Sequence, residues 1–121
     1  MSALFDFHRV WGYLAIAMNA IAGVIALIAW RRRKLRGRWV WITTIVAESA
    51  LLLQVLVGTI LVASKDYVAP RFHMFYGFVA FLTIGIAYQY RNQMRGRREM
   101  LYGLVGLFLM GLGIRAVLQA G

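Results

Sequence analysis

The chain contains two histidines, and both lie in copies of one short motif. FHRVWGYLA (7–15) and FHMFYGFVA (72–80) both fit the pattern F-H-x-x-[WY]-G-[YF]-[LV]-A. An imidazole can bind a metal through one ring nitrogen while the other donates a hydrogen bond. A lone histidine near a membrane boundary would be an ordinary interfacial residue. The matched pair His8 and His73 instead indicates two ligands of one metal.

A glycine follows each histidine by four residues, as Gly12 and Gly77. Residues at i and i+4 share one helix face, so each imidazole would stand beside a shallow trough. A flat porphyrin needs such room when its iron takes an imidazole on each side. The motif therefore predicts a heme with His8 and His73 as its two axial ligands. The alternative is simple packing, because small residues at this spacing also bring membrane helices together.

The composition places this motif in a membrane. The chain has 121 residues, 62% of them hydrophobic, and a formal net charge of +10. Charged residues make up 15%, compared with about a quarter in a soluble domain. The basic residues lie between apolar runs rather than on a folded face, so a nucleic-acid partner is not expected. The absence of cysteine excludes disulfides, thiolate metal sites and covalent heme attachment. The start, MSALFDF, lacks the basic region of a signal peptide.

Four apolar runs are long enough to span a bilayer, which takes about 20 residues. They cover approximately 8–30, 39–63, 72–90 and 100–119. In lipid such runs must be helical, because only a helix satisfies its own backbone hydrogen bonds. Short connections make consecutive helices antiparallel. We therefore predict an all-α, integral membrane four-helix antiparallel bundle, with residues 1–121 forming a single membrane domain.

The basic residues predict the orientation of this bundle. Segments 31–38 and 91–98 hold six and four Lys or Arg residues, which is ten of the fourteen in the chain. The positive-inside rule makes both cytoplasmic, with the N-terminus, the 64–71 connection and the C-terminus outside. The simplest role of these clusters is topology and contact with anionic lipid. A multi-pass protein of the cell membrane follows, with the bacterial inner membrane as its expected location. Both histidines would then lie near the outer face.

Two stretches of the sequence resemble a known protein family. FHRVWGYLA resembles the H-R-x-x-G helix start of heme A synthases, and LLLQVLVGTILV (51–62) followed by His73 resembles their L-Q-x-x-L-G…H run. A looser resemblance extends to four-helix cytochromes b of the b561 type. It implies that His8 and His73 are the axial ligands of one heme b. The chain resembles one of the two bundles of a heme A synthase, and Asp6 stands at a different spacing from the family's acidic residue. Heme A synthesis is therefore not carried over.

Asn19, Glu48 and Gln54 are polar residues that fall well inside the predicted spans. Asn19 and Glu48 should both lie near mid-membrane, where they would hydrogen-bond across the bundle. An ionisable group there costs about 2.5–3.5 kcal/mol on insertion scales. Glu48 would serve as interhelical glue, or else as a proton relay or a quinone contact. Gln54 would either bond helix to helix or touch the heme rim.

Arg115 is expected at the depth of the two histidines, near the outer end of the last helix. Its guanidinium would match a heme propionate, pair with Asp6 or Asp66, or extend to water. Arg9 and Arg71 are similar candidates because they adjoin the histidines.

The predicted function is that of a b-type cytochrome-like membrane protein in electron transfer. The alternative is a heme-free accessory or assembly subunit of a larger respiratory or photosynthetic membrane complex. A weaker third possibility is a transporter with Asn19 and Glu48 as its site. Other membrane subunits are expected partners, since the last helix carries glycines that suit close packing inside the bundle or against another protein. These glycines are Gly103, Gly106, Gly111 and Gly113.

Overall fold

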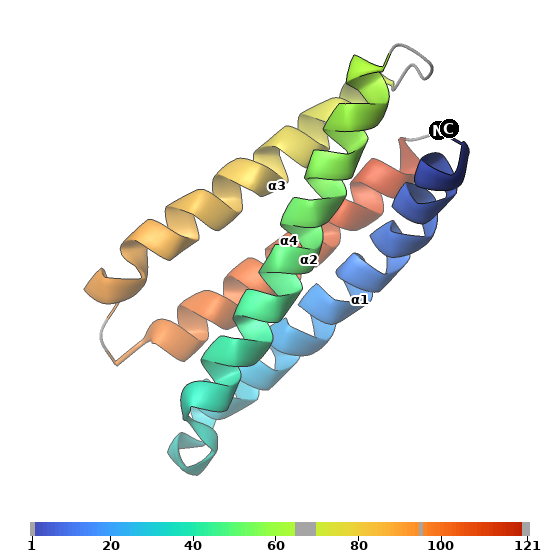
Figure 1. The fold of residues 1–121 in the computed structure, drawn as a ribbon. Coiled ribbons are helices and arrows are strands. Elements are labelled where there is room, and N and C mark those ends of the chain that lie inside the picture. The colour runs from blue at the N-terminus through green and yellow to red at the C-terminus, as the bar shows by residue number, and fades with distance from the viewer. Residues whose placement is uncertain (1, 65–69, 95, 120–121) are drawn as a thin grey trace.

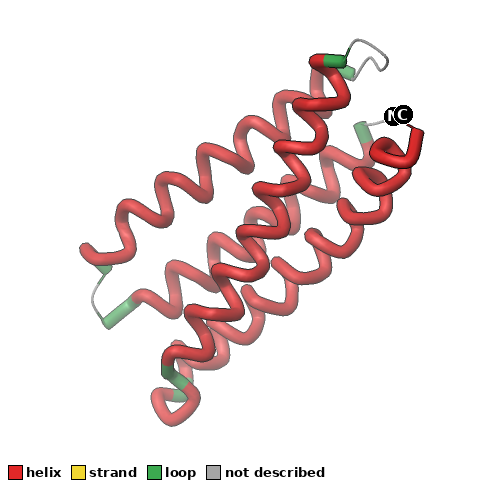
Figure 2. Tube along the Cα trace, in the orientation of Figure 1, coloured by secondary structure: helices red, strands yellow, loops and turns green. Residues whose placement is uncertain are grey.

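The computed structural model describes residues 2–64, 70–94 and 96–119 of the chain. Within these ranges it contains four long α-helices and two single-turn 3-10 helices (Figures 1 and 2). The prediction of an all-α chain with four long helices is confirmed. The long helices are α1 (Ser2–Arg31), α2 (Arg38–Ala63), α3 (Arg71–Tyr90) and α4 (Arg98–Leu118), and the short ones are η1 (Arg33–Leu35) and η2 (Arg91–Gln93).

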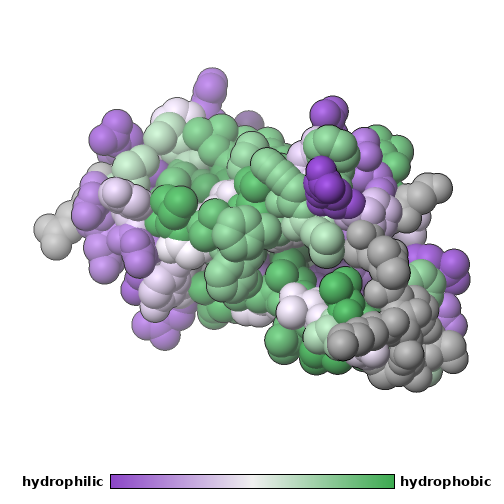
Figure 3. Space-filling view, turned by 90° about the horizontal axis from the view of Figure 1, so that it is seen from above, coloured by the Kyte–Doolittle hydropathy of each residue, from purple (hydrophilic) through white to green (hydrophobic). Residues whose placement is uncertain are grey.

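All four long helices have the length and composition to cross a membrane, with spans of 21 to 29 residues. Many large apolar side chains lie on the outside, and Leu56, Phe78 and Leu104 each expose more than half of their surface. Figure 3 shows hydrophobic residues across the middle of one face and hydrophilic residues mostly toward its ends. This surface is compatible with contact with the acyl chains of a lipid bilayer.

The first helix starts earlier than predicted. α1 begins at Ser2 rather than at residue 8, whereas the other helix ends differ from the prediction by at most two residues. No proline or glycine interrupts residues 2–7, so nothing stops the helix from extending through them. His8 is therefore the seventh residue of α1, whereas the predicted span 8–30 began with it. His73 is the third residue of α3.

α1 lies between α2 and α4 and packs against both. Its buried stripe consists of small or polar residues at alternating spacings of four and three. Small side chains let neighbouring backbones approach closely, which is how helices associate where lipid is as apolar as the protein. The stripe is Ala15, Asn19, Ala22, Ala26 and Ala29, each at most 3% exposed.

Glycines make the contact between α1 and α4. A Cβ atom added at Gly106 would lie 2.9 Å from the Asn19 carbonyl oxygen, and one added at Gly23 would lie 3.0 Å from the Gly103 carbonyl oxygen. Gly113 likewise faces Ile16 of α1. The predicted close packing of the α4 glycines therefore occurs inside the molecule at Gly103, Gly106 and Gly113. Gly111 is different, because a Cβ there would meet no atom within 4 Å.

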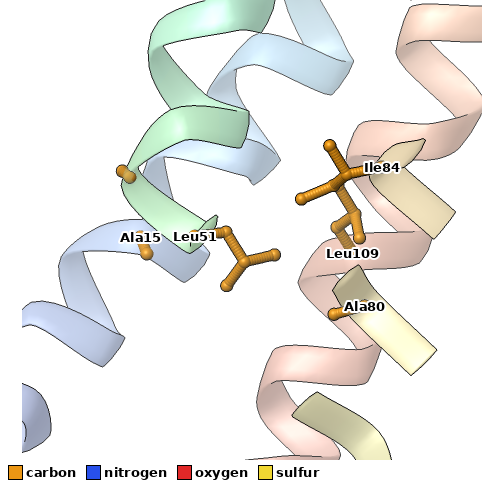
Figure 4. Packing of buried hydrophobic residues seen from close by; sticks show 6 residues of the cluster. Ala15, Leu51, Ala80, Ile84 and Leu109 are labelled. Atoms are coloured by element: carbon orange, nitrogen blue, oxygen red, sulfur yellow. The ribbon is translucent and has the colours of Figure 1, made fainter. Parts of the chain in front are cut away.

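α3 is the most loosely attached helix. It packs mainly against α4 (Figure 1), and 11% of its most apolar window is buried, compared with 22–39% for the other three. Its inward side contributes Ala80 and Ile84 to a buried cluster with Leu51 of α2 and Leu109 of α4. Figure 4 shows Leu51 reaching across toward Ile84 and Leu109. Through this cluster α3 contacts α2 near the centre of the molecule.

The described residues of segments 31–38 and 91–98 lie at one end of the molecule (Figure 1), which we call the basic end. There Arg36 forms an ion pair with Glu99 of α4, with 3.3 Å between Nε and Oε1. It also donates hydrogen bonds to the carbonyl oxygens of Ala29 and Trp30. These carbonyls belong to the last turn of α1, which lacks intrahelical donors. Arg36 thus ties the α1 terminus to α4. At the opposite end α1 begins and α4 ends (Figure 1), and we call this the terminal end.

The glycine contact predicts opposite effects for two matched substitutions in α4. Gly106→Ala places a methyl group against backbone atoms of α1, so the free energy of unfolding should fall by about 1–3 kcal/mol. Gly111→Ala meets open space, so it should leave stability unchanged or raise it by up to about 1 kcal/mol through helix propensity. Reversible unfolding by SDS in micelles, followed by circular dichroism, measures both. Equal effects of the two changes would contradict the contact.

Candidate functional site

The two histidines meet at the terminal end. The imidazole rings of His8 on α1 and His73 on α3 have centroids 6.1 Å apart and planes at 82°. Both residues are half-buried. Their helices do not pack directly against each other, so the side chains reach toward a shared space between them. The two histidines of the repeated motif, 65 positions apart in the sequence, therefore lie at one site.

His73 is held in a defined tautomer. Its Nδ1 lies 2.7 Å from the carbonyl oxygen of Ala116 on α4. A carbonyl only accepts hydrogen bonds, so Nδ1 must be the donor. In a neutral imidazole the lone pair then lies on Nε2, the nitrogen that remains available to bind a metal. This second bond is the usual means of orienting a metal-binding histidine.

The His8 ring packs against α2 at Gly58. A Cβ atom added at Gly58 would lie 2.9 Å from Cε1 of His8, so the absence of a side chain at residue 58 creates the space for this ring. Its Nδ1 is buried and has no hydrogen-bond partner among the described residues. The imidazole of His8 therefore has an unsatisfied polar atom facing the interior.

The predicted trough beside Gly12 is filled. The side chain of Gln54 occupies it, and a Cβ added at Gly12 would lie 2.8 Å from the Gln54 Nε2 atom. That Nε2 donates to the carbonyl oxygen of His8 at 2.5 Å, so Gln54 bonds helix to helix. Gly77 does face open space, because a Cβ there would meet no atom within 4 Å. The two copies of the motif therefore have different surroundings.

Arg115 lies close to this site. It is exposed, its Nε donates to the Tyr76 hydroxyl at 3.4 Å, and its guanidinium carbon lies 5.7 Å from the centre of the Tyr76 ring. Asp6 pairs instead with Arg9 at 3.8 Å. Asp66, the other suggested partner, lies outside the described residues. The remaining candidate cation, Arg71, is exposed at the start of α3.

The predicted bond between Asn19 and Glu48 is wrong. Asn19 is 1% exposed, and its Nδ2 donates to the carbonyl oxygens of Ala15 and Ala47 at 2.8 and 3.1 Å. Consecutive helical residues project about 100° apart, so a helix that turns Ala47 toward α1 turns Glu48 away from it. Glu48 instead lines a groove between α2 and α3.

Two imidazoles can bind a single metal ion. Metal–nitrogen bonds are about 2 Å long, so two ligating imidazoles have centroids about 6 Å apart, as these rings do. Across the described part of the chain, no group of three or more His, Cys, Asp or Glu residues could hold a metal. A structural zinc site, which takes four protein ligands, does not fit these residues.

Neither a protein-family model, nor a curated protein sequence, nor a solved structure matches this chain.

Sequence reasoning missed two residues that shape the site, Gly58 and Ala116. A signal for Gly58 was present, because Ala50, Gln54 and Gly58 follow one another at four-residue spacing and share a face of α2. The Ala50 carbonyl accepts from the Trp11 indole at 2.8 Å. This whole face therefore contacts α1. Ala116 carries no such signal, since it acts through its backbone carbonyl.

The Ala116 contact predicts the tautomer of His73. In protein free of metal, at a pH where both imidazoles are neutral, nitrogen-15 NMR should show a protonated Nδ1 and an unprotonated Nε2 for His73. The His73→Gln variant assigns the signals, because it removes one imidazole and leaves that of His8. A His73 protonated at Nε2 would contradict the hydrogen bond to Ala116.

Proposed function

We propose that this chain is a membrane-embedded, b-type cytochrome-like protein that holds one heme b between His8 and His73 and takes part in electron transfer. The observation that carries the proposal is the imidazole pair, with centroids 6.1 Å apart and the Nδ1 of His73 engaged by Ala116. Heme supplies one-electron redox chemistry, and its axial ligands and their hydrogen bonds tune the potential.

The protein residues around the pair suit this role. The bond from His73 to the Ala116 carbonyl orients the ring and leaves Nε2 as the nitrogen that could bind a metal. Gly58 and Gly77 leave the flanks of the two rings without side chains. Arg115 offers a planar, exposed guanidinium at the same end, which matches a carboxylate such as a heme propionate.

The proposed arrangement in the membrane is an antiparallel bundle with both termini outside. Its support is the position of ten basic residues in segments 31–38 and 91–98, which the positive-inside rule assigns to the cytoplasm. The aromatic residues Trp41, Tyr88 and Tyr102 pack together near the basic end, beside Arg91, as expected at a membrane interface. The corresponding location is the bacterial inner membrane.

A single heme at the terminal end would lie near the outer face. The hydrocarbon layer is about 30 Å thick, and the sequence has no further histidine to build a second site deeper in the bundle. Electron transfer across the membrane would thus need cofactors on partner proteins. The proposed role is electron exchange at one face.

One observation favours a second candidate, a heme-free accessory or assembly subunit of a larger membrane complex. α3 buries the smallest share of its apolar window, 11%. It also exposes an aromatic surface in which Phe72, Phe78 and Phe81 each show half or more of their area. A partner helix would cover this surface. The two proposals are compatible, because an accessory subunit can also hold heme.

The heme proposal predicts a visible spectrum that depends on both histidines. Purified protein should show a Soret band and sharp reduced α and β bands. His8→Gly and His73→Gly should each lower the heme content at least tenfold, and added imidazole should restore it by replacing the missing ligand. Thr59→Ala is the matched control, because Thr59 is exposed and its hydroxyl bonds only to the Val55 carbonyl of its own helix. Folded, colourless wild-type protein that does not take up hemin would overturn the proposal and favour the accessory subunit.

The orientation is tested by labelling, since the chain has no cysteine of its own. Ser64→Cys at the end of α2 should react with a membrane-impermeant maleimide on intact cells. Lys34→Cys in the basic end should react only after the cells are opened. The reverse pattern would place both termini in the cytoplasm.

A further inference from the structure

A groove between α2 and α3 lies apart from the histidines. Its volume is about 320 Å³, within the size range of small-molecule sites. Apolar side chains form most of its wall, together with Glu48, Ser49 and Tyr88. The apolar part consists of Ile45, Leu52, Phe81, Ile84 and Gly85.

Glu48 is the polar residue that distinguishes this groove. The residue is 7% exposed and lines the groove, and no hydrogen bond or ion pair links its carboxyl to another described residue. A buried polar group without a partner is costly, and an ionisable residue in a membrane-spanning segment is by default a candidate functional residue. The amide nitrogen of Asn19, the expected partner residue, donates instead to two backbone carbonyls.

The groove opens sideways between the helices rather than toward the ends of the molecule. Ser49, Phe81, Gly85 and Tyr88 on its rim are all exposed, on the apolar surface that the helices present to their surroundings. A ligand would therefore enter from the lipid phase. An acyl chain would leave the carboxyl of Glu48 without a partner, whereas a ring bearing a carbonyl or hydroxyl group would supply one.

We infer that this groove binds a lipid-soluble quinone or quinol, with its ring between Phe81 and the α2 wall and one ring oxygen at the Glu48 carboxyl. A protonated carboxyl donates to a quinone carbonyl, and an ionised carboxyl accepts from a quinol hydroxyl. The hydroxyls of Ser49 and Tyr88 are the further polar groups on the wall. The groove includes neither histidine, so this inference does not depend on the proposed heme.

The test is a binding titration of the purified full chain in micelles with decylubiquinone. Tryptophan fluorescence reports binding, because the Trp41 ring lies 6.4 Å from the Tyr88 ring at the groove. Decylbenzene, which has the ring and the chain but no oxygen, is the control ligand. Wild-type protein should bind the quinone saturably and at least tenfold more tightly than decylbenzene.

Two groove variants and one matched control locate the site. Gly85→Leu should weaken quinone binding at least tenfold by filling the groove, and it should fold normally because a Cβ at Gly85 meets no atom within 4 Å. Glu48→Ala should weaken binding about tenfold, the worth of a hydrogen bond to a buried acid. Gly111→Leu adds the same side chain at an equally open position on α4, outside the groove, and should bind as wild type.

The inference is overturned by absent saturable binding in wild-type protein, by equal affinity for decylbenzene, or by equal affinities of Gly85→Leu and Gly111→Leu. His8→Gly separates this result from the heme proposal. That variant should keep its quinone affinity even where heme is lost, and Gly85→Leu should keep any heme absorbance.

Discussion

Polar groups inside this bundle depend on partners within the protein, because an apolar surrounding offers none, and only a few, such as His8 Nδ1, have no partner among the described residues. The chain meets this constraint mostly with backbone carbonyls. Trp11 donates to Ala50 and Gln54 to His8 between α1 and α2, while His73 donates to Ala116 between α3 and α4. The Ala50 and His8 carbonyls each have a second lone pair beyond an intrahelical bond, and Ala116 lies in the last turn of α4, where carbonyls lack intrahelical donors. Side-chain donors can therefore lock two helices together without a polar side chain on the partner helix.

These bonds give the helices unequal roles. α1 is fixed to α2 at three levels, through Gln54, Trp11 and Asn19, and to α4 through glycine contacts. α3 depends mainly on α4. The relative position of the two imidazoles is therefore set indirectly, from α1 through α4 to α3. Ala116 is the last link, because its carbonyl holds the ring of His73.

The sequence was sufficient to predict the four long helices and the proximity of the two histidines. Apolar runs bounded by basic clusters predicted the helices, and the repeated motif brought His8 and His73 to one site. The errors concern rotation of helices about their axes, which packing decides. The Glu48 carboxyl turned away from Asn19 because Ala47 faces α1, and Gln54 took the space beside Gly12. A backbone acceptor such as Ala116 has no side-chain signature at all.

Both candidate sites border α3, and its loose attachment explains why. A helix held chiefly by one neighbour leaves its other side partly uncovered, and that side faces α1 at the terminal end and α2 nearer the middle. At the first level the space is bridged by imidazoles 6.1 Å apart. Nearer the middle, the space between α3 and α2 remains open as a groove of about 320 Å³ that contains the buried carboxyl of Glu48. Tighter packing of α3 against α2 would close the groove, so the space beside Glu48 depends on the small buried share of α3.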